Sequence, residues 1–151
     1  MSSIEEMKDE INSKTMNLVL LVTATGGIYL ILWLWRNCRI IEKITNCKIA
    51  DDVFLIWIAV CYGLAKTFIG LSVQLNILGS ILSIAGGILC MVWSFKAKKA
   101  IQEYALNEHK IDLRMNAFYT IIFNVYYINY CINDLPEAKR KQDILDSKLK
   151  M

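Results

Sequence analysis

The 151-residue sequence has one proline, one histidine and no acidic residue within its long apolar runs. Because Pro136 lies near the end of the chain, proline cannot kink any candidate membrane span. His109 has no cysteine or histidine at zinc-ligand spacing. No phosphate-binding loop, zinc-protease motif or hydrolase serine motif occurs. We therefore predict no catalytic, cofactor-binding or metal-binding residues and no enzymatic activity.

The cysteines also lack the spacing pattern of a disulfide-stabilised small domain. Their number is odd and no C-x-x-C pair occurs; they are Cys38, Cys47, Cys61, Cys90 and Cys131. A disulfide framework is not expected, and we interpret all five as reduced thiols. The N-terminus is acidic, so it does not read as a cleavable signal peptide. A net charge of +3 is too small to indicate a nucleic-acid partner.

The chain does contain long apolar segments. Hydrophobic residues make up 56% of the sequence, and only Lys66 of the 17 lysines and arginines lies inside a long apolar run. We predict an all-α, polytopic membrane helical bundle that forms a single domain over residues 1–151. It has three transmembrane helices, a fourth candidate and cytoplasmic helical extensions. The expected segments are a leader at 2–14, spans at 15–35, 53–73 and 77–95, a fourth span or interfacial helix at 115–133, and a charged tail helix at 136–150.

The first two segments are predicted from the spacing of their apolar residues and from their length. Ser3 and Glu6 have capping-box spacing, and the apolar residues of 2–14 recur at helical intervals. This leader could lie on the membrane surface or be solvated. Residues 15–35 are uncharged and, as a helix of about 30 Å, match the hydrocarbon thickness. The Gly26-Gly27 pair loosens this span or admits a neighbouring backbone.

Residues 53–95 form a run of 43 residues with one charge, too long for a single crossing. We predict a hairpin with its turn near 72–76. Small residues recur every four positions in each arm: Ala59, Gly63 and Thr67 in one, and Gly79, Ser83 and Gly87 in the other. Pairing the arms places Gly63 opposite Gly87 and Thr67 opposite Ser83. Such small residues let helices approach closely in lipid.

Residues 115–133 are uncharged but rich in tyrosine and asparagine, so they could cross the membrane or lie in the headgroup region. Three crossings would place 2 basic residues on one side and 14 on the other, whereas four would place 7 and 9. Under the positive-inside rule, either arrangement puts loops 36–52 and 96–114 in the cytoplasm. The side of the C-terminus stays open.

Two stretches resemble a known family. Gly27, Ile28, Tyr29 and Trp33 precede a basic helical extension, and Tyr126 and Asn133 close the apolar region. This arrangement resembles the bacterial membrane family called domain of unknown function 4234, over roughly residues 15–135. The resemblance implies a multi-pass protein of the bacterial inner membrane. It implies no activity, because the family has none established.

The two stretches also resemble each other. Aligning Tyr29 with Tyr126 places Trp33 opposite Tyr130. This pattern indicates either a weak internal duplication or shared interface chemistry.

Lys66 is the sharpest functional candidate, because an ionisable group within a span is costly. It could reach the hairpin turn, form a structural hydrogen bond or serve transport. We expect the lipid bilayer as a partner, together with a second copy or another membrane protein, and no nucleic acid or small-molecule substrate. The favoured function is a structural or assembly component. The alternative is a subunit of an oligomeric transporter or channel that uses Lys66.

Overall fold

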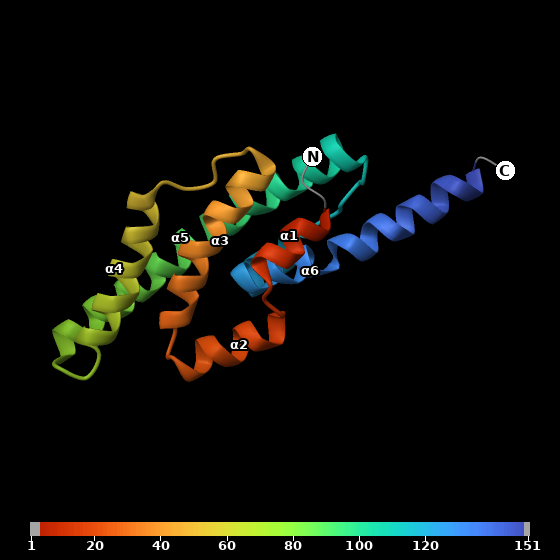
Figure 1. Ribbon diagram of the computed structural model, residues 1–151. Coiled ribbons are helices and arrows are strands. Elements are labelled where there is room, and N and C mark those ends of the chain that lie inside the picture. Colours follow the sequence, from red (N-terminus) through yellow and green to blue (C-terminus); the bar gives the residue numbers. More distant parts are fainter. Residues whose placement is uncertain (1–3, 150–151) are drawn as a thin grey trace.

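The structure is a computed structural model that describes residues 4–149. The described residues form six helices and no strand, which confirms the all-α prediction. In Figure 1, α4 and α5 make a long hairpin at one end, and the last part of α6 extends from the other. The helices are α1 (Ile4–Ile11), α2 (Thr15–Ala24), α3 (Ile28–Thr45), α4 (Asp52–Phe68), α5 (Val73–His109) and α6 (Ala117–Leu149).

The α4–α5 hairpin turns at residues 69–72, earlier than expected. Gly70 has a φ of +92°, which glycine adopts without steric cost. Its amide donates to Asn76 Oδ1 at 2.6 Å, and Ser72 caps α5 by accepting from the Leu75 amide at 3.3 Å. The polar residues near 72–76 do build the turn, but α5 begins inside that cluster. The predicted spans 53–73 and 77–95 are therefore α4 and the first part of α5.

The earlier turn changes which small residues meet. A Cβ placed on Gly79 would lie 2.9 Å from the Ala65 carbonyl oxygen, and one on Gly86 would lie 3.3 Å from Cys61 Cβ. These glycines allow the two backbones to pack closely. A Cβ on Gly63 or Gly87 would meet nothing within 4 Å. The expected apposition of Gly63 with Gly87 is therefore wrong.

The segment 15–35 is not one helix, so that expectation is also wrong. Gly26 (φ +59°) and Gly27 (φ +95°) end α2, and α3 starts at Ile28. The Gly27 amide donates to the Val22 carbonyl at 2.7 Å and the Gly26 amide to Thr23 at 3.1 Å. These two bonds form a Schellman motif, which closes a helix with a left-handed glycine.

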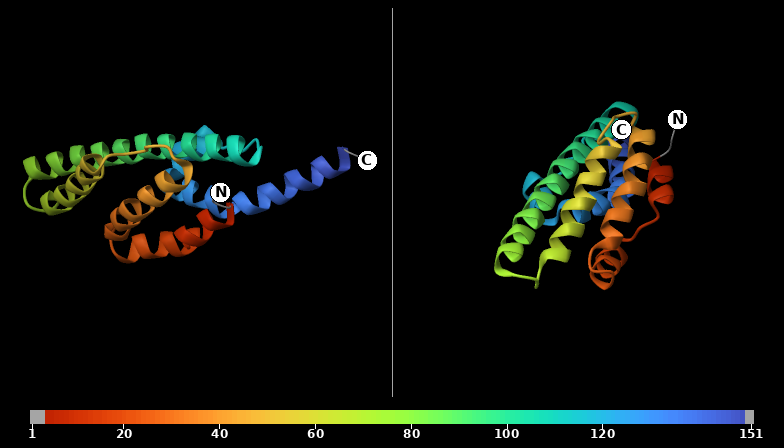
Figure 2. Two further views of the ribbon diagram at one scale, coloured as in Figure 1. Left: turned by 45° about the horizontal axis from the view of Figure 1, so that its top comes forward. Right: turned by 90° about the vertical axis from the view of Figure 1, so that its left-hand side faces the viewer.

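The chain doubles back at this motif, as the left view of Figure 2 shows for α2 and α3. Contacts between residues before α2 and residues of α3 support this reversal. Glu10, before α2, forms an ion pair with Lys43 on α3 at 3.3 Å. Arg36 Nη2 donates to the Glu10 carbonyl at 3.4 Å. Both ends of the 15–35 segment therefore return to the same region of the molecule.

A second sharp bend divides α6 at Asn124, whose φ is 48° and ψ is −121°. The Asn124 side chain accepts a short hydrogen bond from the Ser94 hydroxyl of α5. Tyr127 reaches back so that its hydroxyl accepts from the Asn116 amide at 2.9 Å. A straight span over 115–133 is therefore wrong. So is a separate tail helix beginning at Pro136, because α6 continues through Pro136.

The main core joins α1 to α3, α5 and α6. Ile4, Met7 and Ile11 are at most 3% exposed, so α1 packs against the protein rather than lying free. The predicted capping residue Ser3 lies outside the described residues. Asn129 and Asn133 of α6 each donate to the Ser13 carbonyl, at 2.9 and 2.8 Å. These bonds fix α6 against the link between α1 and α2.

The helical extensions beyond the apolar segments are confirmed. α3 continues to Thr45, and α5 continues to His109 with Ala97, Ile101 and Tyr104 buried. The loop between α3 and α4 is held by Glu42, whose Oε1 accepts from the amides of Ile49 at 2.6 Å and Ala50 at 2.9 Å. The right view of Figure 2 shows α3, α4 and α5 running side by side.

Candidate functional site

The α4–α5 hairpin exposes a broad apolar surface. Large hydrophobic side chains stand outward along both helices, including Val73 at 72%, Ile84 at 64% and Val53 at 63% exposed. Soluble monomers rarely expose apolar patches of this extent. α5 is the one helix among residues 4–149 that is long and apolar enough to cross a membrane. Only 17% of the residues in an 18-residue apolar stretch of this helix are buried. The arrangement fits contact with lipid.

Charged and aromatic side chains mark one edge of this surface. Lys96 Nζ lies 5.6 Å from the centre of the Phe54 ring, and Arg39 lies 5.4 Å from the centre of the Trp35 ring. Arg39 also pairs with Asp52 at 2.9 Å, where α4 begins. The boundary thus joins three helices at one level. Aromatic and basic residues typically occupy this position at a membrane–water interface.

Behind this boundary lies a tightly packed cluster of aromatic and thiol groups. Trp93 is fully buried, and its Nε1 donates to Cys38 Sγ at 3.3 Å. The Trp33 and Trp93 rings meet edge to face, with centroids 6.2 Å apart. Burial raises the pKa of the Cys38 thiol to about 11, so the thiol is protonated at neutral pH. All five cysteines are free.

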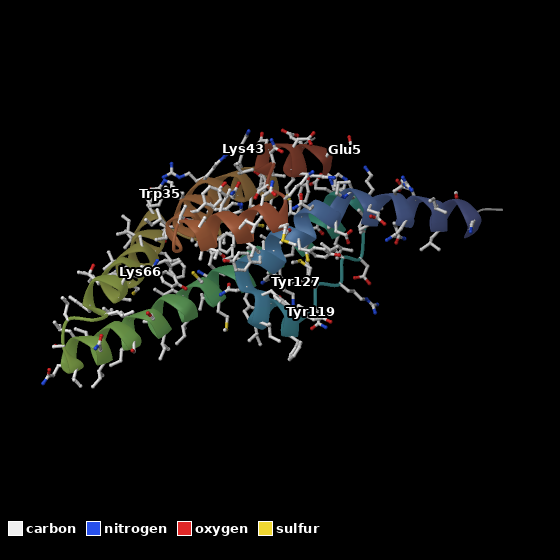
Figure 3. All side chains as sticks on the ribbon, turned by 90° about the horizontal axis from the view of Figure 1, so that it is seen from below. Glu5, Trp35, Lys43, Lys66, Tyr119 and Tyr127 are labelled. Atoms are coloured by element: carbon white, nitrogen blue, oxygen red, sulfur yellow. The ribbon has the colours of Figure 1, made fainter. Side chains whose placement is uncertain are left out.

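Lys66 lies beyond the boundary in the last turn of α4, two residues before the helix ends at Phe68 (Figure 3). Its ammonium lies over the reversal between α2 and α3: a Cβ placed on Gly26 would be 3.0 Å from Nζ, and one on Gly27 would be 3.6 Å away. The C-terminus of α2 carries the negative end of the helix dipole, which favours a cation there. Among the described residues, no hydrogen bond or ion pair joins Lys66. The side chain thus faces the reversal and not the hairpin turn.

A cavity of about 350 Å³ opens beside this ammonium, between the α2–α3 reversal and α4. Val22, Ile28, Leu30 and Ile31 supply apolar walls. Gly63 and Lys66 line the α4 side. Sequence reasoning singled out Lys66 and Gly63 but missed that the reversal brings Gly26 and Gly27 to them. The paired glycines were the available signal.

A second hollow of about 580 Å³ lies between α2 and α6 and is lined mainly by tyrosines. Tyr119 and Tyr127 lie close together in Figure 3, with ring centroids 5.8 Å apart. Tyr126, from the predicted signature, also lines this hollow. Its lining holds no charged side chain.

The signature residues take structural positions. Gly27 completes the Schellman motif, and the Tyr29 amide donates to Thr25 Oγ1 at 3.0 Å. Trp33 packs on Trp93, and Asn133 binds the Ser13 carbonyl. Ile28 is exposed. Gly27 and Asn124 each stand two residues before the aligned tyrosines and each has a positive φ. The two resembling stretches therefore both follow a break in a helix.

Polar groups line a cavity of about 370 Å³ between α3 and α5, among them Lys43, Glu103 and Glu108. Among residues 4–149, no group of three or more His, Cys, Asp and Glu side chains could hold a metal ion. His109 Nε2 lies 3.1 Å from the Tyr104 hydroxyl, and partial burial lowers the pKa of this histidine.

No family model matches the chain, and no match was found among curated proteins or solved structures. The resemblance to domain of unknown function 4234 therefore stays a prediction.

Proposed function

We propose that this protein is a membrane-embedded assembly component without enzymatic activity, anchored by the α4–α5 hairpin in a bacterial inner membrane. The observation that carries the proposal is the outward apolar surface of this hairpin. The apolar part of α5, residues 73–95, measures about 34 Å and exceeds a 30 Å hydrocarbon layer. α4 measures about 25 Å, so the turn at 69–72 completes the second crossing.

The other two apolar segments enter the membrane in part and return. α2, with 10 residues, reaches only about 15 Å, half the hydrocarbon thickness. The segment before the Asn124 bend, residues 117–123, is shorter still. Backbone that leaves a helix at membrane depth is tolerated where protein covers it, and here α4 and Lys66 lie beside the α2–α3 reversal.

This arrangement supports a simpler topology than three or four crossings. Helix α1, the end of α6 and the loops at 36–52 and 96–114 lie on one side, together with every described lysine and arginine except Lys66. The positive-inside rule makes that side cytoplasmic. The basic extensions then meet anionic lipid, an attraction of about 1 kcal/mol per lysine or arginine near the surface.

The assembly role draws on small residues that the fold leaves uncovered. Gly63 is exposed and has open space above its Cα. Because small residues let transmembrane helices approach closely, this face of α4 suits a neighbouring membrane protein. Glu42, which accepts from the amides of Ile49 and Ala50, has a structural role.

Two measurements test the proposal. Alkaline carbonate extraction should leave the chain in the membrane pellet; release into the supernatant would contradict membrane embedding. A photo-crosslinking residue at position 63 should give discrete protein adducts in native membranes, whereas one at Ile77, near the hairpin tip, should give far fewer. Only lipid adducts at position 63 would contradict the assembly role.

A further inference from the structure

Among residues 4–149, the ammonium of Lys66 has no ion-pair partner. It offers three hydrogen-bond donors, yet among the described residues none is used. The dipole of α2 compensates only part of a full charge. An ionisable group within a span is expensive and normally pairs with another group. Lys66 is therefore an unpaired cation beside an apolar cavity.

The apolar segments of the chain cannot supply an acidic partner. No Asp or Glu occurs in residues 15–35, 53–95 or 115–133. The nearest acidic residue along α4 is Asp52, 14 residues away and therefore about 21 Å along the helix. Asp52 is already paired with Arg39. A second copy of the chain brings no carboxylate to this depth either, because its apolar segments are the same.

The depth of Lys66 also argues against a lipid headgroup as the partner. Ala65, next to Lys66, packs on Gly79 of α5, which lies six residues and about 9 Å from the start of that helix at Val73. The Lys66 side chain faces the Gly26-Gly27 reversal and not the hairpin tip. Phosphates of the bilayer lie at its surface, so a carboxylate carried within a helix is the better match.

The cavity beside Lys66 has open space at Gly63. Gly63 lies one turn before Lys66, lines the same cavity of about 350 Å³, and has no atom within 4 Å of an added Cβ. A neighbouring backbone can therefore approach α4 at Gly63 while its side chain reaches the ammonium. The remaining walls are mainly apolar and include the hydroxyl-bearing Thr23 and Tyr62.

We propose that the Lys66 cavity docks a transmembrane helix of a different polypeptide, one that carries an Asp or Glu at the depth of Lys66. This inference rests on the proposed assembly role and specifies an acidic side chain on the partner helix. Charge pairing fixes the depth and identity of the partner helix, and Gly63 provides the close approach.

Designed transmembrane peptides test this directly. One carries a single Glu in a Leu/Ala helix at the depth of Lys66, its twin carries Gln there, and a third carries Glu two turns away. The full-length protein and a labelled peptide are reconstituted in phosphatidylcholine vesicles. Energy transfer between the protein and the peptide is measured at increasing peptide concentrations. The matched Glu peptide should bind about tenfold more tightly than its Gln twin and the shifted peptide.

Variants separate charge from shape. Lys66→Met should abolish the preference for Glu, Lys66→Arg should retain it, and Lys66→Glu should favour a Lys peptide instead. Gly63→Leu fills open space, so it should weaken Glu-peptide binding while leaving the helical circular dichroism unchanged. Unaltered dichroism in each variant shows that the chain still folds.

Three outcomes would overturn the inference. Equal affinity for the Glu and Gln peptides removes the charge pairing. Loss of the Glu preference when phosphatidylglycerol is added assigns the site to lipid. Energy transfer between labelled copies that depends on Lys66 assigns it to self-association. Because carbonate extraction tests membrane embedding separately, any of these would leave that part of the proposed function standing.

Discussion

The carboxylate of Glu10 lies 3.3 Å from the ammonium of Lys43, although 33 residues separate them. Between them run a 21-residue uncharged segment and the reversal at Gly26-Gly27. An ion pair across a full membrane crossing is impossible, because its two members would lie about 30 Å apart. This contact therefore brings the two ends of the apolar segment together.

Glu10 and Lys43 should be joined by a zero-length carbodiimide cross-link in intact membranes. Both side chains lie partly or largely in solvent and within bonding range. Mass spectrometry should find a peptide pair that links residue 10 to residue 43. The Lys43→Gln variant serves as the control and should lose it. Absence of the pair in the wild type would speak against the reversal.

Gly79→Ala should destabilise the hairpin by about 1–3 kcal/mol, because the new Cβ meets the Ala65 carbonyl oxygen at 2.9 Å. Gly63→Ala is the matched control: open space surrounds it, and alanine stabilises a helix by about 0.5–1 kcal/mol relative to glycine. Unfolding in mixed micelles with increasing dodecyl sulfate measures both. Equal effects would contradict the packing at Gly79.

Gly26→Ala should cost about 1–2 kcal/mol, since alanine is strained at a φ of +59° and its Cβ would crowd Lys66 Nζ. Gly87→Ala has neither problem and should be neutral or stabilising. The same micelle titration compares the two. A harmless Gly26→Ala would indicate that residues 15–35 form a continuous helix.

Cys38 should resist maleimide, whereas the half-exposed Cys47 should react. Burial raises the pKa of Cys38 to about 11, and the Trp93 indole covers its sulfur. Only the thiolate reacts, so Cys38 labelling should rise as the pH increases from about 9 toward 11. Mass spectrometry of digested, labelled protein gives the rate at each site. Rapid labelling of Cys38 at pH 7 would contradict its burial.

Long-range periodicity made part of this fold predictable. Helical extensions beyond the apolar segments were predicted, and α5 has one in which Ala97, Ile101 and Tyr104 are buried. A turn near 72–76 was also predicted. The register of the hairpin was not predictable, because each residue rotates a helix by about 100°. A turn at 69–72 therefore exposes Gly63 and brings Gly79 and Gly86 inward.

Little in the sequence indicated the helix breaks at Gly26-Gly27 and Asn124. Gly26-Gly27 lies within uniformly apolar sequence, so composition favoured a continuous span. Asn124 is one asparagine among several, and only its hydrogen bond with Ser94 distinguishes it. The Glu42 contacts with the amides of Ile49 and Ala50 depend on a loop shape that no local pattern encodes. Lys66 was predictable as a candidate, but its position over Gly26 depended on the reversal.

Protease protection of terminal epitope tags tests the central claim most directly. One tag precedes Met1, one follows Met151, and a third is inserted at Gly70 in the hairpin turn. In inverted inner-membrane vesicles both terminal tags should be digested and the turn tag protected, with the opposite pattern in right-side-out vesicles. Protection of either terminal tag in inverted vesicles would contradict an arrangement in which only the α4–α5 hairpin crosses.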